Sequence, residues 1–391
     1  MCTEAGNIFI NNSLNVSEKQ PYYLNITNLM PIKHAQILNG YLMPFILVIT
    51  IIANTLILLV LSKRHMRTPT NILLMSMALS DMFTLLIPSP WLFYAYTFDH
   101  HAQPLYPLAA CYAFRIMYEI IPNLFHTASI WLTLALALQR YIYICHPILA
   151  RTWCTSQGIN KVVFWIFLLA GLHQAAQPFA SIYVSRDIAW GGRMVTVCEE
   201  IYSSWLCTIT PNVYFSLYYW FRVIFVHVIP CTFLVFLNVL LCIALKRADL
   251  KKRKLLKDKK DRNEFKKLRD SNMTTLMLIV VVTVFLCVEI PLGVVTILHI
   301  INNSMFEVLN YDIAQALILF TNFFIIVSYP VNFAIYCGMS REFRKTFTEL
   351  FLRRNNNDKS FNSNATYAKV NMSTSKYVGP DANAGILETN L

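Results

Sequence analysis

Three polar side chains stand inside long apolar stretches of this sequence, where their chemistry is conspicuous. Asp81 lies in LLMSMALSD, Ser129 in HTASIWLTLAL and Asn332 in SYPVNFAIY. A carboxylate in apolar surroundings needs a counter-charge or a proton, because an isolated buried charge is costly. The three oxygen-bearing side chains can hold a small hard cation such as sodium, or a hydrogen-bonded water network. The sequence leaves both possibilities open.

A second acid, Glu289, interrupts the apolar run LCVEIPLG. Burial disfavours a charged carboxylate, so two states compete. Glu289 is either protonated, donating a hydrogen bond to His126 or Asn322, or ionised and paired. Candidate counter-charges are Arg115, protonated His126 or a ligand group. We predict the protonated form, because Arg115 lies about three helical turns from His126.

No catalytic motif accompanies these residues. The chain has no HEXXH, no glycine-rich phosphate loop, no GxGD-like aspartate and no paired catalytic carboxylates, and it contains only 10 Gly. We therefore expect a protein that is not an enzyme, with no catalytic residues. We expect no metal site and no cofactor apart from the possible structural sodium ion.

The elements that position the polar residues are long apolar segments. Hydrophobic residues make up 56% of the chain and charged residues only 14%, well below the usual quarter. Apolar stretches of about 18 residues or more predict membrane-spanning helices. Seven occur, at about 37–61, 72–96, 108–143, 160–180, 213–245, 273–301 and 311–337. The predicted fold is an all-α membrane protein, a bundle of seven transmembrane helices.

The basic residues fix an orientation for this bundle. Loops on one side carry 22 Lys and Arg, against 4 on the other. Because positive loops stay in the cytoplasm, the N-terminus is predicted outside and the C-terminus inside the cell, in a multi-pass plasma-membrane protein. The basic segment 246–270 is predicted to extend helices five and six toward anionic lipid and a cytoplasmic partner, not nucleic acid.

The segments outside the spans have distinct patterns. Residues 1–36 form a predicted extracellular tail with glycosylation sequons at Asn11, Asn15 and Asn25. Alternating β-branched and polar residues on either side of a Gly pair predict a β-hairpin within 181–212. After the helical domain 37–338, residues 340–352 form an amphipathic helix expected on the lipid bilayer surface. Residues 353–391 are predicted to be a disordered, phosphorylatable tail.

One motif per span, in order, resembles the rhodopsin-like G-protein-coupled receptors. The motif residues are Asn54, Asp81, Ser129, Arg140, Trp165, Pro230, Pro291, Asn332 and Tyr336. The resemblance implies a sodium or polar network of Asn54, Asp81, Ser129 and Asn332. It implies G-protein coupling and activation through Gln139, Arg140, Tyr141, Glu289, Pro291, Asn332 and Tyr336. It also implies a disulfide between Cys111 and Cys198, which ends the predicted hairpin.

The sequence departs from that family pattern at informative positions. Gln139 replaces the acid that usually precedes the activation arginine, so Arg140 lacks its familiar ionic restraints. Elevated basal signalling or a different lock is therefore expected. Phe333 replaces the proline expected after Asn332, and Pro330 should move the bend of helix seven by about one turn.

Ligand classes can be narrowed from the same helices. The seventh span contains no Lys for a retinal Schiff base, and Pro122 stands where amine receptors have an aspartate. A peptide fits the long hairpin and the sequon-bearing tail. Candidate ligand residues are Arg115, Glu119, Asn123, His126, Arg222, Glu289 and His299; the four on helix three form one predicted stripe. Trp91 and Tyr94 are candidates for stacking on ligand aromatics.

Residues 110–350 are most similar to the invertebrate sex peptide receptors, also called myoinhibitory peptide receptors. HTASIWLTLALALQRYIYICHP, EIPLGVV and SYPVNFAIYCGMSREFR carry the likeness. It implies a receptor for an extracellular amidated neuropeptide with paired tryptophans, signalling to heterotrimeric G proteins of the inhibitory type. Arrestin is an expected partner of the phosphorylated tail. Alternatives are a receptor for FMRFamide-like or myosuppressin-like amidated peptides, or an orphan constitutive receptor.

Overall fold

The computed structural model describes residues 24, 32–257, 262–304 and 310–351. The sequons at Asn11, Asn15 and Asn25 and the predicted tail 353–391 lie outside these residues. The chain divides into two compact units, Met1–Ser340 and Arg341–Leu391. The first unit holds the helical bundle and a β-hairpin, and the second holds one described helix, α16 (Arg341–Phe351).

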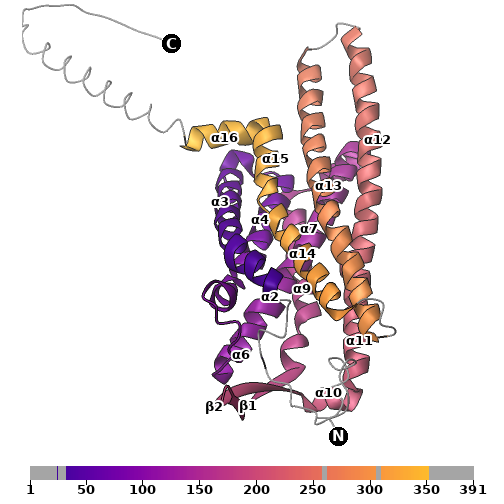
Figure 1. Ribbon diagram of the computed structural model, residues 1–391. Coiled ribbons are helices and arrows are strands. Elements are labelled where there is room, and N and C mark those ends of the chain that lie inside the picture. Colours follow the sequence, from indigo (N-terminus) through magenta and orange to yellow (C-terminus); the bar gives the residue numbers. More distant parts are fainter. Residues whose placement is uncertain (1–23, 25–31, 258–261, 305–309, 352–391) are drawn as a thin grey trace, which may run out of the picture. The chain divides into compact units, whose positions relative to one another are not determined.

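Seven helical spans are long and apolar enough to cross a membrane. They are Gln36–Leu61, Pro69–Thr97, Leu108–Cys145, Ser156–Phe179, Pro211–Arg247, Asn272–Asn302 and Ile313–Met339. Each overlaps one of the seven predicted spans, so the predicted all-α bundle is confirmed. Figure 1 shows the helices side by side, with the hairpin at one end of the bundle, called the hairpin end below.

Most spans combine an α-helix with a short segment, labelled η, that is wound more widely as a π-helix or, in span four, more tightly as a 3₁₀ helix. Spans one to three contain η2 (Gln36–Leu42) with α3 (Met43–Leu61), α4 (Pro69–Leu86) with α5 (Ser89–Leu92) and η4 (Phe93–Thr97), and α6 (Leu108–Phe114) with η5 (Arg115–Ile120) and α7 (Ile121–Cys145). Spans four to seven contain α9 (Ser156–Gln174) with η6 (Gln177–Phe179), α11 (Pro211–Arg222) with η7 (Val223–Val228) and α12 (Ile229–Lys257), α13 (Arg262–Ser304), and α14 (Tyr311–Ser328) with α15 (Val331–Met339). The connections include α2 (Ile32–Ala35), η3 (Arg64–Met66), α8 (Pro147–Trp153) and α10 (Ser204–Ile209).

Local sequence explains where several helices begin and bend. Thr68 caps α4, its side chain accepting a hydrogen bond from the Asn71 backbone N–H at 3.2 Å. Thr155 caps α9 in the same way. Helix seven is interrupted between Ser328 and Val331, where Pro330 stands. This confirms the predicted position of the bend, because a proline cannot donate the helical hydrogen bond.

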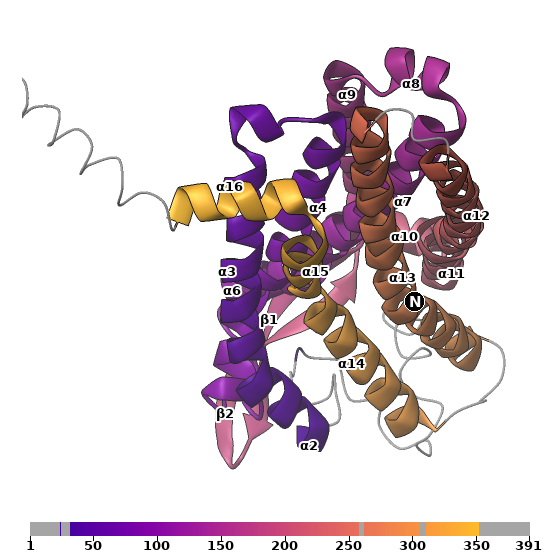
Figure 2. The same ribbon diagram turned by 90° about the horizontal axis from the view of Figure 1, so that it is seen from above.

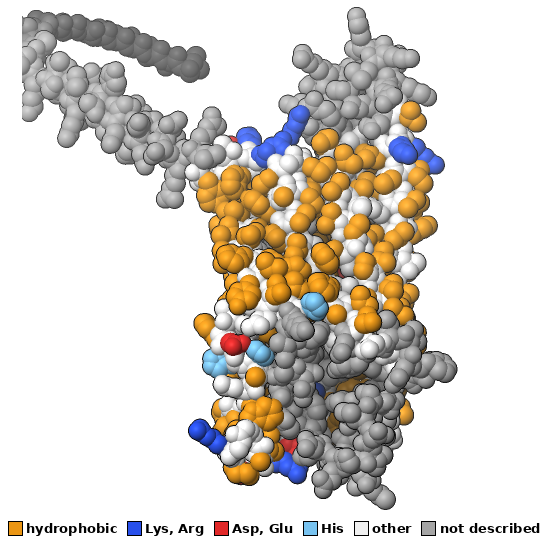
Figure 3. Space-filling view, in the orientation of Figure 1, with side chains coloured by type: hydrophobic (Ala, Val, Ile, Leu, Met, Phe, Trp, Pro, Cys, Tyr) orange, Lys and Arg blue, Asp and Glu red, His pale blue; other side chains and the backbone are white. Residues whose placement is uncertain are grey.

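The flank of the bundle is covered with apolar side chains. Figure 3 shows this hydrophobic band along the helices, with Lys and Arg gathered toward the two ends. Large apolar residues such as Phe45, Ile49 and Phe236 are more than half exposed. Exposed apolar surface on this scale is what lipid solvates. The band therefore supports the transmembrane assignment.

The core of the bundle lies around α7. This helix packs against α4, α9 and α12, and Figures 1 and 2 both show α7 between α4 and α12. Ile130, Leu132 and Leu136 on α7 are completely buried. The polar residues carried by α7 are thereby held at the centre of the bundle.

The predicted hairpin is formed by β1 (Ser181–Trp190) and β2 (Arg193–Tyr202). The strands are antiparallel, and Gly191 and Gly192 make the turn with φ values of 57° and 79°, which favour glycine. The predicted disulfide Cys111–Cys198 joins β2 to α6. The backbone of Leu24 continues this layer, since its N–H donates to the Cys198 carbonyl at 2.8 Å.

Candidate ligand site and activation network

A cavity of about 690 Å³ opens among the helices toward the hairpin end. Its walls come from spans one, two, three, five, six and seven, together with Tyr202 of β2. Four of the predicted ligand residues line it, namely Asn123, His126, Arg222 and His299. Arg222 is the only Lys, Arg, Asp or Glu among the described lining residues. The cavity therefore suits a ligand segment that is neutral or rich in hydrogen-bond acceptors.

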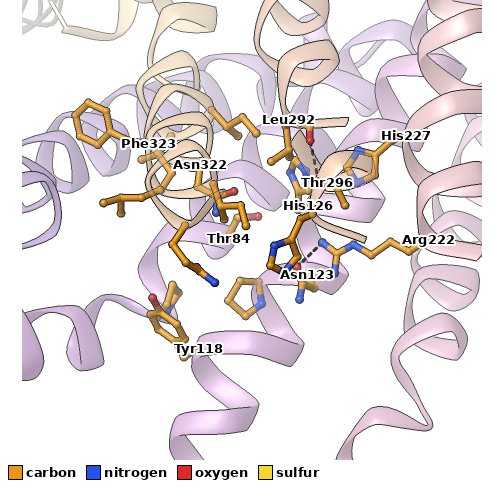
Figure 4. A pocket seen from close by; sticks show the side chains of 18 of the residues that line it. Thr84, Tyr118, Asn123, His126, Arg222, His227, Leu292, Thr296, Asn322 and Phe323 are labelled. Carbon is orange, nitrogen blue, oxygen red and sulfur yellow. Dashed lines mark hydrogen bonds between the residues drawn. The ribbon is translucent and has the colours of Figure 1, made fainter. Parts of the chain in front are cut away.

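Arg222 is held across the cavity by helix three. Its Nη2 donates a hydrogen bond to Asn123 Oδ1 at 2.7 Å, and Figure 4 shows this contact beside His126. Arg222 ends α11, where the π-helical segment η7 begins. A guanidinium carries five N–H donors in a planar fork, so the single bond to Asn123 leaves donors available to a ligand carbonyl.

The structure does not bring Arg115 and Glu119 to this cavity, so the predicted four-residue stripe on helix three is wrong in its outer half. Both residues lie in the π-helical segment η5, whose wider turn rotates them away from the α-helical register of Asn123 and His126. Arg115 is instead buried against the hairpin. It forms an ion pair with Glu200 and donates to the Gln177 carbonyl at 3.1 Å.

Trp91 and Tyr94 also lie outside the cavity lining. Trp91 packs edge-on against Tyr94 and Phe114, with ring centroids 6.3 and 5.6 Å apart. The Tyr94 ring stacks on His100 at 4.6 Å. These aromatic contacts hold the second and third spans together near the hairpin end, so stacking on a ligand is not their role in this conformation.

Glu289 lies behind the cavity, completely buried. His227 Nδ1 is 2.8 Å and His126 Nε2 is 3.5 Å from Glu289 Oε1. Arg115 is paired elsewhere, and Asn322 lines the cavity without a hydrogen bond to Glu289. Two imidazoles around one carboxylate favour an ionised Glu289 more than the protonated form predicted from the sequence. His227 Nδ1 is within hydrogen-bond distance of the acid, so it can donate to an ionised carboxylate.

His227 is the functional residue that sequence reasoning missed. It is buried in η7, in the stretch VHVIP just before Pro230. The available signal was a polar side chain inside an apolar span. Its partner stands 62 residues away on α13, and helical periodicity within one span cannot reveal a contact between two spans.

A second, much smaller cavity surrounds Asp81. Its volume is about 20 Å³, and Asp81, Ser129, Glu289 and Asn332 are among its lining residues. Ser129 Oγ donates to Asp81 Oδ1 at 2.7 Å, and Asn332 Nδ2 lies 3.5 Å from Oδ2. The carboxylate, hydroxyl and amide oxygens suit a small hard cation, and the space suits one ion or one water molecule. Asn54, also predicted in this network, bonds instead to the Thr50 carbonyl at 3.1 Å.

Arg140 stands at the end of the bundle opposite the hairpin. It forms no salt bridge with any residue that the structure describes, as the departure at Gln139 predicted. Its guanidinium lies 5.9 Å from the centroid of the Tyr143 ring one turn further on. That ring supplies a cation–π contact in place of an acid. Tyr143 in turn donates its hydroxyl to the Cys154 carbonyl at 3.1 Å.

Helices five and six are joined on the same half of the bundle. Asn238 stands where the family usually has a tyrosine, and its Nδ2 donates to Thr283 Oγ1 at 3.0 Å. Apolar contacts among Leu234, Leu237, Val282 and Leu286 surround this bond. Separation of the two helices at this point requires the loss of that bond and of these contacts.

Comparisons with known proteins agree with this architecture. The family model described as serpentine type 7TM GPCR chemoreceptor Srw matches residues 41–354. The sex peptide receptor of Drosophila melanogaster is 51% identical over 333 residues, which are 85% of this chain and 76% of the relative. Sex peptide receptor-related protein 2 of Caenorhabditis elegans is 30% identical over 360 residues, 90% of this chain and 79% of the relative. The FMRFamide receptor of Drosophila melanogaster is 27% identical over 329 residues, 81% of this chain and 54% of the relative.

These matches extend over the seven spans, the hairpin and the helix after span seven. They agree with the receptor family that the ordered motifs from Asn54 to Tyr336 indicated. The chain therefore belongs to the rhodopsin-like seven-transmembrane G-protein-coupled receptors, close to the sex peptide receptors.

Proposed function

We propose that this receptor responds to amidated neuropeptides with paired tryptophans, of the sex peptide and myoinhibitory type, and signals through inhibitory G proteins. The observation that carries the proposal is the 51% identity to the sex peptide receptor over 85% of the chain. The cavity supports it, because about 690 Å³ accommodates a short peptide segment with bulky side chains. Its lining combines apolar and aromatic side chains with polar ones, among them Asn123, His126, Arg222, His299 and Asn322.

The orientation in the membrane belongs to the same proposal. The N-terminus lies outside and the C-terminus in the cytoplasm in this proposal, which the distribution of basic loops supports. The hairpin end and the cavity then face the peptide, and Arg140 faces the G protein. Glycans on Asn11, Asn15 and Asn25, arrestin binding to a phosphorylated tail and the contact of α16 with the bilayer complete the arrangement.

A sodium ion in the small cavity is a further part of the proposal. Asp81, Ser129 and Asn332 supply oxygen atoms around a space for one ion. A cation there neutralises the buried Asp81 carboxylate and stabilises the conformation in which these side chains converge. One water molecule with a protonated Asp81 is the competing occupant.

The second candidate is a receptor for FMRFamide-like or myosuppressin-like peptides. The 27% identity to the FMRFamide receptor favours it, although this chain covers only 54% of that relative. An orphan receptor with constitutive signalling is the third, favoured because Arg140 forms no salt bridge with the described residues.

A peptide screen separates these candidates. Cells expressing the chain with dissociation sensors for inhibitory, stimulatory and phospholipase-coupled G proteins are exposed to a library of amidated neuropeptides. We expect di-tryptophan amidated peptides to activate the inhibitory sensor at the lowest concentrations. Arg140→Ala is the matched control, because it should reach the surface and bind peptide without activating the sensor. A selective response to Phe-amide peptides would favour the second candidate, and ligand-independent activity without any peptide response would favour the third.

A further inference from the structure

The floor of the large cavity consists of two imidazoles that share one buried oxygen atom. His126 and His227 line the cavity, and Figure 4 shows both beside Thr296 and Leu292. His227 Nδ1 lies 2.8 Å from Glu289 Oε1, within hydrogen-bond distance, and His126 Nε2 lies 3.5 Å from the same oxygen, close enough for an ion pair but without hydrogen-bond geometry. Their ring centroids are 6.4 Å apart. The other nitrogens, His126 Nδ1 and His227 Nε2, make no hydrogen bond to the part of the chain that the structure describes.

This shared oxygen restricts where the protons can be. An ionised carboxylate only accepts hydrogen bonds, so His227 Nδ1, which lies within hydrogen-bond distance of it, then carries hydrogen. When that ring is neutral, its other nitrogen, Nε2, carries a lone pair.

Protonation of both rings is disfavoured by the surroundings. Two imidazolium ions and one carboxylate would leave a net positive charge in a site where Glu289 is fully buried and His227 only 2% exposed. The Arg222 guanidinium bonds to Asn123, one helical turn from His126 on the same helix, and adds like-charge repulsion. The acids near the rings are Glu289 itself and Asp81, whose carboxylate interacts electrostatically with His126. At least one acceptor nitrogen is therefore presented to the cavity.

Arg222 supplies the complementary group. Its hydrogen bond to Asn123 Oδ1 occupies one donor, and the others are available to a carbonyl oxygen. Near one turn of helix three, the cavity thus offers the Arg222 guanidinium as a hydrogen-bond donor to a ligand C=O. It also offers at least one imidazole nitrogen as an acceptor for a ligand N–H. No Asp or Glu lines the cavity in the described residues, so the ligand's positive groups have no counter-charge at this depth.

We propose that His126, His227 and Arg222 form a subsite for a primary carboxamide, the amidated C-terminus of the peptide. The NH₂ group donates to an imidazole nitrogen fixed as acceptor by Glu289, and the C=O accepts from Arg222. This inference rests on the proposed function. It predicts that the C-terminal end of the peptide enters the cavity first.

The subsite discriminates between amidated and free-acid peptides. A C-terminal carboxylate has no hydrogen to donate, so it leaves the imidazole lone pair unpaired and places a second anion near Glu289. Sites built to hydrogen-bond a donor reject analogues that lack it by large factors, because buried groups lose their partners. We expect the free-acid form to bind about 100-fold more weakly.

Competition binding of a matched peptide pair tests the assignment. The pair is one di-tryptophan neuropeptide with a C-terminal carboxamide and the same peptide with a free carboxylate, each displacing a labelled amidated peptide from membranes. The key variant is the triple replacement His126→Leu, His227→Leu and Glu289→Leu. It removes the charged cluster as a unit, so no unpaired ion remains to prevent folding. Thr321→Val is the matched control, because it lies outside the cavity lining and its hydroxyl bonds the Leu317 carbonyl of its own helix at 2.8 Å.

The measured quantity is the ratio of the two inhibition constants, which cancels differences in expression and coupling. We expect about 100 for wild type and for Thr321→Val, and below about 5 for the triple variant. An unchanged ratio in the triple variant, or a wild-type preference for the acid, overturns the subsite. A wild-type receptor that binds neither peptide instead refutes the proposed function, and with it the ligand on which the subsite depends.

Discussion

The pair Glu289 and His227 joins helix six to helix five in the interior of the bundle, and its removal should destabilise the receptor in a non-additive way. The atoms are 2.8 Å apart, with Glu289 completely buried and His227 only 2% exposed. His227→Leu leaves the carboxylate with His126 alone, at 3.5 Å. The loss of one partner from a buried ion pair costs about 3–5 kcal/mol, because the remaining charge is uncompensated.

The magnitude can be carried through to a melting temperature. At about 2–4 °C per kcal/mol, His227→Leu should lower the Tm of purified receptor by roughly 6–20 °C. Glu289→Leu removes the charge and leaves only an unpaired imidazole N–H, which costs about 1–3 kcal/mol. The double variant Glu289→Leu with His227→Leu replaces both partners by apolar groups and should return to within about 3 °C of wild type.

Thermal unfolding of the four receptors, followed with a thiol-reactive fluorophore or by loss of ligand binding, measures this cycle. Thr283→Val is a useful control, because it removes a bond between the same two helices that is more exposed. If the double variant melts as low as the two single losses added together, the two side chains do not act as a pair. The charge assignment for Glu289 would then be wrong, and the protonated form predicted from the sequence would be restored.

Three further predictions concern other parts of the network. Tyr143→Ala removes the ring under Arg140 and should raise ligand-independent G-protein activation about two- to fivefold at equal surface expression, as a cation–π contact of about 0.5–1 kcal/mol implies; unchanged basal activity would exclude this lock. Glu200→Gln leaves the buried Arg115 without its charge partner and should speed hydrogen exchange in the hairpin about tenfold or more, with the disulfide intact; equal exchange would show that the disulfide alone holds the hairpin. Asp81→Asn should abolish the ability of sodium to weaken agonist binding, measured by competition in sodium against N-methylglucamine buffers; sodium sensitivity that survives would locate the ion elsewhere.

Sequence reasoning predicted those features that depend on local patterns. The seven spans follow from composition, the hairpin from alternation around Gly191 and Gly192, and the bend in helix seven from Pro330. The Cys111–Cys198 disulfide followed from the family pattern. Each of these depends on a short stretch of chain or on a motif at fixed spacing, so contacts between distant parts of the chain have little influence on it.

The parts that failed depend on contacts between helices or on small changes of helical pitch. Arg115 and Glu119 share an ideal α-helical stripe with His126, but the π-helical segment η5 adds residues to a turn and moves them off it. Glu289 contacts His227, which lies on another span, and periodicity within α13 cannot indicate such a contact. The charge state of Glu289 likewise depends on groups of other spans, His126 and His227, whose positions no pattern within α13 can give.

The two cavities are separated by very few side chains, and this arrangement has a thermodynamic consequence. Glu289 lines the small cavity, while its Oε1 contacts both imidazoles that form the floor of the large one. Tyr329 and Ile325 line both spaces. A ligand that reorients either imidazole therefore alters a carboxylate that borders the Asp81 site. If sodium bound at Asp81 weakens peptide binding by some factor, bound peptide must weaken sodium binding by the same factor. Glu289 is the group that can exert this coupling, because it borders the small cavity and contacts the floor of the large one.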